Sequence, residues 1–223
     1  EDEREEERSQ TLTRGVVAGL RASVEPLRAA LAEGGSVGDV MSVGREAVGR
    51  LGRLLAELDV LAGSVPDAAR ARTSVRDELE RVVSALEPED ARRVRVDHRT
   101  DRVVLCFPDD LARICHALLV NALYVTPRER AVVITTRDEP DGGVRVEVKD
   151  GGPGVPSKHR ARIFMPFYST HPGVETSGLG LSLARSLARR GGGTLELLPD
   201  DGEGGATFVL RLPANDVAPS GPS

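Results

Sequence analysis

Apolar residues in the first 66 positions recur at alternating intervals of three and four, which is the spacing of a coiled-coil seam. We therefore expect an antiparallel hairpin of two helices over residues 1–66, joined by a turn at residues 34–36. Pro26 should bend the first helix, because proline removes a backbone donor and crowds the preceding turn. The first seam is Val17, Leu20, Val24, Leu27 and Leu31, and the second is Val48, Leu51, Leu55, Leu58 and Ala62.

One hairpin cannot bury both seams well, so the pattern also bears on oligomeric state. Two copies would bury the seams in a dimeric four-helix bundle, and we expect a homodimer of this kind. The alternative, a hairpin packed on the rest of its own chain, stays open. The charged run at residues 1–8 indicates a solvated start of the first helix.

Residues 67–213 show short apolar runs separated by turns, with a few amphipathic helices between them. Strands in runs with three helices on one face predict a two-layer sandwich, so the expected fold class is α+β. The residues from 214 to 223 are rich in Pro, Ser and Ala and predict a disordered tail. Helices are expected at 75–86, from Asp109 or Asp110 to 123, and at 181–190, and strands at 94–96 and 103–107 around a turn, 131–136, 144–148, 194–198 and 206–212.

The composition narrows the function classes. A net charge of −5, with arginines scattered among acids, gives no basic surface for nucleic acid. No apolar run reaches membrane-spanning length, and Cys106 and Cys115 lie in apolar patterns typical of buried free thiols. We expect a cytoplasmic protein. Because the chain starts with Glu rather than Met, we expect it to be a piece of a longer protein, with room for a sensory or membrane segment upstream.

The first candidate functional residue is Asp150. It follows a strand pattern and opens a turn that contains Gly152 and Gly154. A carboxylate there can accept a hydrogen bond from an amino group such as adenine N6, although such a turn alone is more often structural. Asn121 lies on an apolar helix, where its amide has either a structural partner or a role as an oxygen ligand for Mg²⁺. A second glycine pair, Gly178 and Gly180, opens a helix whose N–H groups could face phosphates.

These motifs occur in order and together resemble the sensor histidine kinases, within the GHKL ATPase superfamily. Asn121 resembles the family's N box, and the glycine turn after Asp150 resembles its G1 box. The stretch from 163 to 170 resembles the F box, and the stretch from 178 to 181 resembles the G2 box. The hairpin is similar to the family's dimerisation and phosphoacceptor domain, in which a proline such as Pro26 follows the phosphorylated histidine.

The resemblance implies ATP and Mg²⁺ as ligands and a response regulator or other signalling protein as partner. It implies that Asp150 holds adenine N6 and that Asn121 binds Mg²⁺. Thr207 resembles a family threonine behind the adenine-binding acid. The full set of implied ATP-binding residues is Asn121, Asp150, Gly152, Gly154, Phe167, Thr170, Gly178, Leu179, Gly180 and Thr207.

The sequence departs from the family at the acceptor. The family's spacing from Pro26 places Arg21 where the phosphorylated histidine should be, and the first 97 residues contain no histidine. Arginine stays charged and cannot act as a nucleophile. Ala117, one turn before Asn121, lacks the carboxylate with which the gyrase branch activates water, and neither Tyr124 nor His171 supplies a permanent cation near phosphate.

Three functions remain in view. The first is a histidine-kinase-type signalling protein that binds ATP but does not phosphorylate its own hairpin, a pseudokinase acting as a dimeric regulator. The second is an active kinase whose acceptor lies elsewhere in the chain or on a partner. The third is a serine kinase of the anti-sigma type, against which the hairpin argues. A degenerate domain that no longer binds nucleotide is a further alternative.

Overall fold

The computed structural model describes residues 2–61, 69–169, 178–199, 202 and 204–214, without the side chains of residues 2–12, 53 and 56. These residues divide into two compact units. The first unit combines Glu1–Val65 with Ile163–Leu183, and the second combines Pro66–Arg162 with Ala184–Ser223. The expected tail from residue 215 onward lies outside the described residues.

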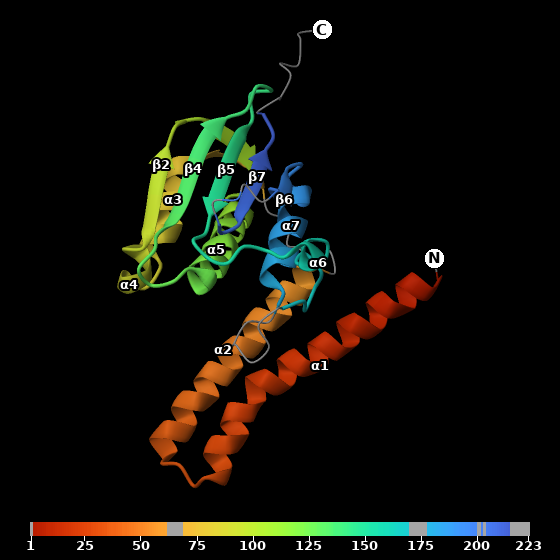
Figure 1. Ribbon diagram of the computed structural model, residues 1–223. Helices are drawn as coiled ribbons and strands as arrows, with labels where there is room; N and C mark the ends of the chain where they lie inside the picture. The colour runs from red at the N-terminus through yellow and green to blue at the C-terminus, as the bar shows by residue number, and fades with distance from the viewer. Residues whose placement is uncertain (1, 62–68, 170–177, 200–201, 203, 215–223) are drawn as a thin grey trace. The chain divides into compact units, whose positions relative to one another are not determined.

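The hairpin of the first unit contains the two expected helices, α1 (Asp2–Ala32) and α2 (Val37–Leu61). Gly34 makes the turn between them with φ of 68°, and the Ser36 hydroxyl accepts a hydrogen bond from the Asp39 amide (3.2 Å) at the start of α2. Helix α1 continues through Pro26 and changes direction in its second half (Figure 1).

The helices of the hairpin pack through a narrow core that leaves much of the apolar seam uncovered. Leu54 is 3% exposed and lies against Gly19, where an added β-carbon would be 3.1 Å from Leu54 Cδ2. By contrast, the seam residues Val48 and Leu55 are 69% and 58% exposed. Two sets of partly or fully exposed apolar residues follow a seven-residue spacing, the α1 stripe of Val17, Val24 and Leu31 and the α2 stripe of Met41, Val48 and Leu55.

The second unit is built on a mixed five-stranded sheet in the order β2-β4-β5-β7-β6. Strands β2 and β4 are parallel and the other neighbours are antiparallel, while β1 and β3 form a separate antiparallel pair. Helix α7 begins in the first unit and continues in the second. The bounds are β1 (Ala71–Ser74), α3 (Val75–Ser84), α4 (Pro88–Ala91), β2 (Val94–His98), β3 (Val103–Cys106), α5 (Pro108–Val125), β4 (Val132–Asp138), β5 (Val144–Lys149), α6 (Ser157–Arg160), α7 (Gly180–Arg190), β6 (Thr194–Leu197) and β7 (Thr207–Leu212).

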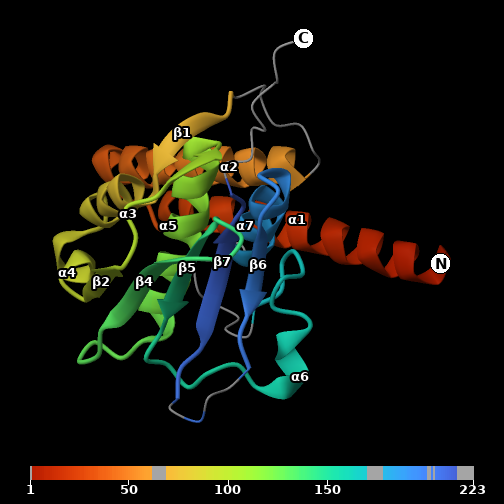
Figure 2. The ribbon, with the colours of Figure 1, turned by 90° about the horizontal axis from the view of Figure 1, so that it is seen from above.

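The core of this unit lies between the sheet and the helices on one of its faces. Figure 2 shows α3 and α5 on that face. Alternate residues of β5 point into the core and lie opposite buried residues of β7, as Val146 does with Leu210. Leu118 and Leu119 of α5 are fully buried, and the free thiols Cys106 and Cys115 are also buried. The architecture confirms the expected α+β sandwich.

Two local predictions for the second unit differ from the structure. Strands β2 and β3 flank a turn but do not pair with each other, because β2 pairs with β4 and β3 with β1. Neither Asp109 nor Asp110 caps α5, which begins at Pro108 after Phe107. Proline already has the helical φ, so both acids fall within the first turn, and Asp110 pairs with Arg190 there (3.0 Å).

Candidate nucleotide-binding site

Asp150 directly follows β5, and its carboxylate is fixed through one oxygen. Oδ1 accepts hydrogen bonds from the Gly152 amide (2.9 Å) and the Ala206 amide (3.0 Å). Oδ2 accepts none from the residues that the structure describes. Burial raises the pKa of the Asp150 carboxyl, and the two amide hydrogen bonds oppose that rise. The side chain is therefore an oriented, 4% exposed acceptor with one oxygen left for an external donor.

Three glycines let the backbone close around Asp150. A β-carbon on Gly152 would lie 2.8 Å from the Val125 carbonyl oxygen, and one on Gly154 would lie 3.0 Å from that of Gly205. A β-carbon on Gly205 would lie 2.1 Å from the Asp150 carbonyl oxygen, and both Gly154 and Gly205 have positive φ, 77° and 80°. Gly152 and Gly154 were predicted from the sequence, whereas Gly205 was not. Its only sequence signal is a glycine pair just before β7.

The C-terminal end of helix α5 is hydrogen-bonded to the glycine turn that follows Asp150. The Thr126 hydroxyl accepts a hydrogen bond from the Gly151 amide (3.0 Å). Arg93 donates from Nη2 to the carbonyl oxygens of Leu123 (3.3 Å), Thr126 (2.7 Å) and Pro127 (3.3 Å). These contacts satisfy carbonyls that a helix leaves unpaired at its C-terminal end. The position of α5 relative to the turn is thus fixed from both sides.

Asn121 lies on α5 at the edge of the core. It is partly exposed and shares a helix face with Ala117 four residues before and Tyr124 three residues after, and Tyr124 is 45% exposed. The amide therefore does not need a buried structural partner and is open to a ligand. No group of three or more His, Cys, Asp or Glu side chains suited to a metal ion occurs among the described residues, so an ion at Asn121 would take its other ligands from water and phosphate.

Thr207 lies beside Asp150 along the sheet, but the structure describes no hydrogen bond between their side chains. Thr207 is opposite Lys149 in the β5–β7 register, whereas Ala206 exchanges hydrogen bonds with Asp150. Because neighbouring strand residues alternate faces, the Thr207 and Ala206 side chains point to opposite sides.

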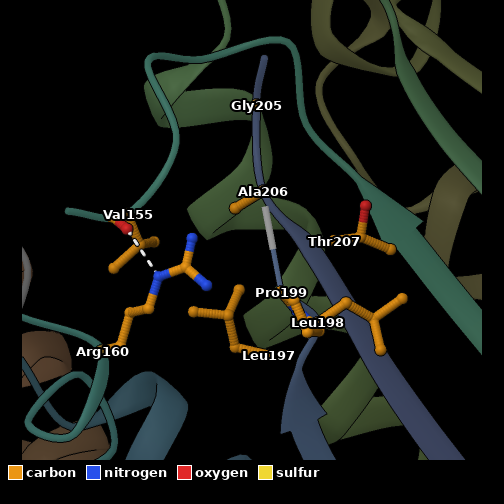
Figure 3. A pocket seen from close by; sticks show the side chains of 8 residues that line it. All are labelled: Val155, Arg160, Leu197, Leu198, Pro199, Gly205, Ala206 and Thr207. Carbon is orange, nitrogen blue, oxygen red and sulfur yellow. Dashed lines mark hydrogen bonds between the residues drawn. The ribbon is translucent and has the colours of Figure 1, made fainter. Parts of the chain in front are cut away.

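A small pocket of about 10 Å³ adjoins Thr207 and shares Gly205 and Ala206 with the surroundings of Asp150 (Figure 3). Arg160 crosses it and donates from Nε to the Val155 carbonyl oxygen (3.0 Å). Neither Asp150 nor Asn121 lines it. Its other lining residues are Leu197, Leu198, Pro199, Gly205, Ala206 and Thr207.

The first unit contains four of the predicted site residues, Phe167, Gly178, Leu179 and Gly180. Phe167 has a φ of 61°, the one positive φ outside glycine among the described residues. Gly178 packs on it, since a β-carbon there would lie 2.9 Å from the Phe167 carbonyl carbon. Leu179 is fully buried, and α7 begins at Gly180. The predicted Thr170, and His171 beside it, lie outside the described residues.

Arg21, at the expected acceptor position, is exposed on α1. Thr13, Arg14, Val17 and Ala18 lie beside it on the same helix surface. None of these neighbours carries an imidazole or a carboxylate.

Comparison with known proteins identifies similar sequences and folds. The family described as "Histidine kinase-, DNA gyrase B-, and HSP90-like ATPase" matches residues 106–216. The sensor histidine kinase ZraS of Klebsiella oxytoca is 33% identical over 108 residues, covering 48% of this chain and 23% of that protein. The sensor protein ChvG of Rhizobium meliloti is 32% identical over 219 residues, covering 87% of this chain and 37% of that protein.

Solved structures share the fold. The histidine kinase AdeS of Acinetobacter baumannii superposes with a TM-score of 0.67 at 17% identity, covering 88% of this chain and 98% of that one. The chain spans less than two fifths of the length of ZraS or ChvG. Within the described part of the chain, no helix has the length and apolar character needed to span a bilayer.

Proposed function

We propose that this chain, which belongs to the sensor histidine kinase family, binds ATP and Mg²⁺ and acts as a dimeric signalling regulator that does not phosphorylate its own hairpin. The chain contains a histidine-kinase-type ATPase domain. The finer function, including the nucleotide, the metal and the missing phosphorylation, is our inference from the residues described above.

The observation that carries the proposal is the Asp150 carboxylate, held by two backbone amides through Oδ1 alone. An oriented acceptor with an unused oxygen suits a donor such as the amino group of adenine. The glycines at 152, 154 and 205 let the backbone pack closely around the Asp150 turn.

The other predicted residues would hold the remainder of the nucleotide. Asn121 would bind Mg²⁺ through its amide oxygen, with phosphate and water completing the coordination. Gly178, Leu179 and Gly180 would present the N-terminal amides of α7 to phosphates, and Phe167 would contact the nucleotide from the segment before them. When bound, Mg²⁺ would neutralise phosphate charge.

Arg21 is the reason to propose a regulator rather than a self-phosphorylating kinase. Phosphoryl transfer to the hairpin needs a nucleophile in line with the terminal phosphate, and a guanidinium cannot serve. We therefore propose that ATP binding, and not transfer, is what this chain contributes. Its partners would be a second copy of the chain through the hairpin and a response regulator or other signalling protein in the cytoplasm, where ATP is available.

Calorimetry with the full chain tests the nucleotide. We expect ATP to bind in the presence of Mg²⁺ and binding to be lost in Asp150→Asn, because an amide nitrogen at the Oδ2 position would meet the adenine amino group as a second donor. Asp109→Asn, which removes an exposed carboxylate at the start of α5, is the matched control and should bind as the wild type does. Equal affinity in both variants would remove Asp150 from the site. A wild type that binds no nucleotide would indicate a degenerate interaction domain.

Incubation with γ-labelled ATP and Mg²⁺ tests the missing transfer. We expect no acid-labile label on the chain, because no histidine lies in the hairpin. Acid-labile label would contradict the pseudokinase proposal and favour the alternative, an active kinase with its acceptor elsewhere. The same assay with Arg21→His shows whether the acceptor alone is missing, since label restored by that substitution would mean that the ATP site is competent.

A further inference from the structure

A proton on the Asp150 carboxyl has only one oxygen available to it. The hydrogen bonds from the Gly152 amide (2.9 Å) and the Ala206 amide (3.0 Å) both end on Oδ1. A backbone N–H only donates, so Oδ1 has to remain an acceptor whether the carboxyl is ionised or protonated. No described residue donates to Oδ2. The proton of the neutral acid therefore lies on Oδ2.

The carboxyl group keeps the same orientation in both protonation states. Turning the neutral group over would point its O–H at two N–H donors and lose both hydrogen bonds, which is costly for a buried group. The backbone is also close to Oδ1, because β-carbons on Gly152 and Gly205 would lie 3.1 Å and 3.3 Å from it. One proton thus changes Oδ2 from an acceptor to a donor without moving the side chain.

The ionisable side chains on the neighbouring elements are directed elsewhere. Lys149 ends β5 on the sheet face opposite the core, and Tyr124 lies on the Asn121 face of α5. Arg130 donates to a carbonyl oxygen of the glycine turn (3.2 Å), and Arg93 donates to carbonyl oxygens at the end of α5. Burial raises the pKa of the Asp150 carboxyl and the two amides oppose that rise, with no charged side chain among the causes.

We propose that the site accepts a second class of ligand, the 6-oxopurine nucleotides such as ITP, when Asp150 is protonated. This rests on the proposed function, in which Oδ2 faces the group at position 6 of the purine. Ionised Asp150 accepts from the amino group of adenine, whereas protonated Asp150 donates to the oxygen that hypoxanthine carries there. In the two other combinations a donor meets a donor or an acceptor meets an acceptor. The base preference therefore inverts with one proton.

The size of the pH effect follows from linkage alone. ATP binds the ionised fraction of the chain and ITP binds the protonated fraction, and the ratio of these fractions changes about tenfold per pH unit. The ratio of the Kd for ITP to the Kd for ATP should fall by the same factor for each unit by which the pH is lowered. Both ligands carry the same ribose and triphosphate, so titration of the phosphates cancels in this ratio.

Calorimetric titration of the full chain with ATP and with ITP, in Mg²⁺ at about pH 5.5 and about pH 7.5, tests the proposal. The Kd ratio of the wild type should fall about 100-fold at the lower pH. ITP binding at the higher pH should take up a proton, which titrations in buffers of different ionisation enthalpy measure. Asp109→Asn, which removes an exposed carboxylate at the start of α5, is the control and should behave as the wild type does.

Asp150→Asn tests the same pairing without titration. Its carbonyl oxygen can accept from the Gly152 and Ala206 amides, which places its NH₂ donor where Oδ2 was. This variant should prefer ITP to ATP at both pH values, with a ratio that does not change between them. A variant that binds ATP more tightly than ITP would contradict the proposal.

The wild-type series decides the question even if Asp150→Asn does not fold. A wild type that binds ATP with a pH-independent Kd ratio would disprove the binding of 6-oxopurines through Oδ2 and leave ATP binding in place. If the wild type binds neither nucleotide at either pH, the proposed function fails and this proposal fails with it.

Discussion

The buried Asp150 carboxylate should make the stability of the fold depend on pH. Burial raises its pKa above the ordinary value of 3.8. A raised carboxyl pKa means that the folded state favours the protonated form, so the contribution to stability is present below pH 3.8 and is lost as pH rises through the folded pKa. Asp150→Asn, which does not titrate, should therefore gain stability relative to the wild type as pH rises from 4 to 7.

Urea unfolding of both proteins at pH 4 and pH 7 measures this difference. The Asn carbonyl oxygen can replace Oδ1 and accept from the Gly152 and Ala206 amides, so the variant should fold at both values. A stability difference that stays constant, or turns in favour of the wild type at pH 7, would show that the two amide hydrogen bonds outweigh the cost of burial.

Single residues were predictable where their signal is local in the sequence. Asp150, Gly152 and Gly154 directly follow a strand pattern, so the sequence alone predicts that they share one turn. Gly205 touches Asp150 only because β7 returns to β5 after more than fifty residues, and no local pattern contains that return. The placement of Thr207 depends on the same register, which is why the sequence could name it but could not orient it.

At the scale of elements, Arg93 should determine how firmly α5 is held at its C-terminal end. Its guanidinium is 17% exposed and donates to three carbonyl oxygens there. Arg93→Ala should lower the free energy of unfolding by about 2 to 3 kcal/mol, because charge-assisted hydrogen bonds to partly buried carbonyls of Leu123 and Thr126 are lost. Denaturant unfolding measures the change.

The neighbouring arginine provides the control for this prediction. Arg92 is exposed, and its alanine variant should change the free energy of unfolding by less than about 0.5 kcal/mol. Similar losses in both variants would mean that net charge, and not the contacts to α5, accounts for the effect. Arg93→Lys should recover only part of the loss, since one ammonium cannot reproduce the spread of the guanidinium.

Elements with a strong period were predictable, but their pairing was not. The helices α1, α2 and α5 follow the apolar period over several turns. Strand β1 has the sequence Ala-Arg-Thr-Ser, which shows no apolar alternation, and it forms because β3 lies beside it. Strand β2 pairs with β4 across an intervening strand and helix, so its partner is set by packing rather than by the turn that follows it.

For the whole molecule, the α1 and α2 stripes predict association of two chains. Met41, Val48 and Leu55 are 60%, 69% and 58% exposed at heptad spacing, the pattern of a helix face that meets another helix. We expect the chain to be a dimer of twice its 23.8 kDa mass and Leu55→Glu to be monomeric. Light scattering after size-exclusion chromatography measures both.

Ser42→Glu is the matched control, because Ser42 is exposed on the same helix but is rotated by about 100° from the stripe. This variant should remain dimeric. A monomeric wild type would contradict the four-helix bundle, and loss of the dimer in both variants would indicate that added negative charge alone drives the chains apart. The change in apolar period along the chain predicts two domains, but no pattern in the sequence predicts that Ile163–Leu183 groups with the hairpin.

The unused oxygen of Asp150 also has a consequence for nucleotide selectivity. An ionised carboxylate only accepts hydrogen bonds, and the two backbone amides that fix Oδ1 prevent the group from turning away. Guanine and hypoxanthine carry an oxygen where adenine carries its amino group, so they would set acceptor against acceptor at Oδ2. Rejection of GTP and ITP would then follow from lone-pair repulsion rather than from the size of the base.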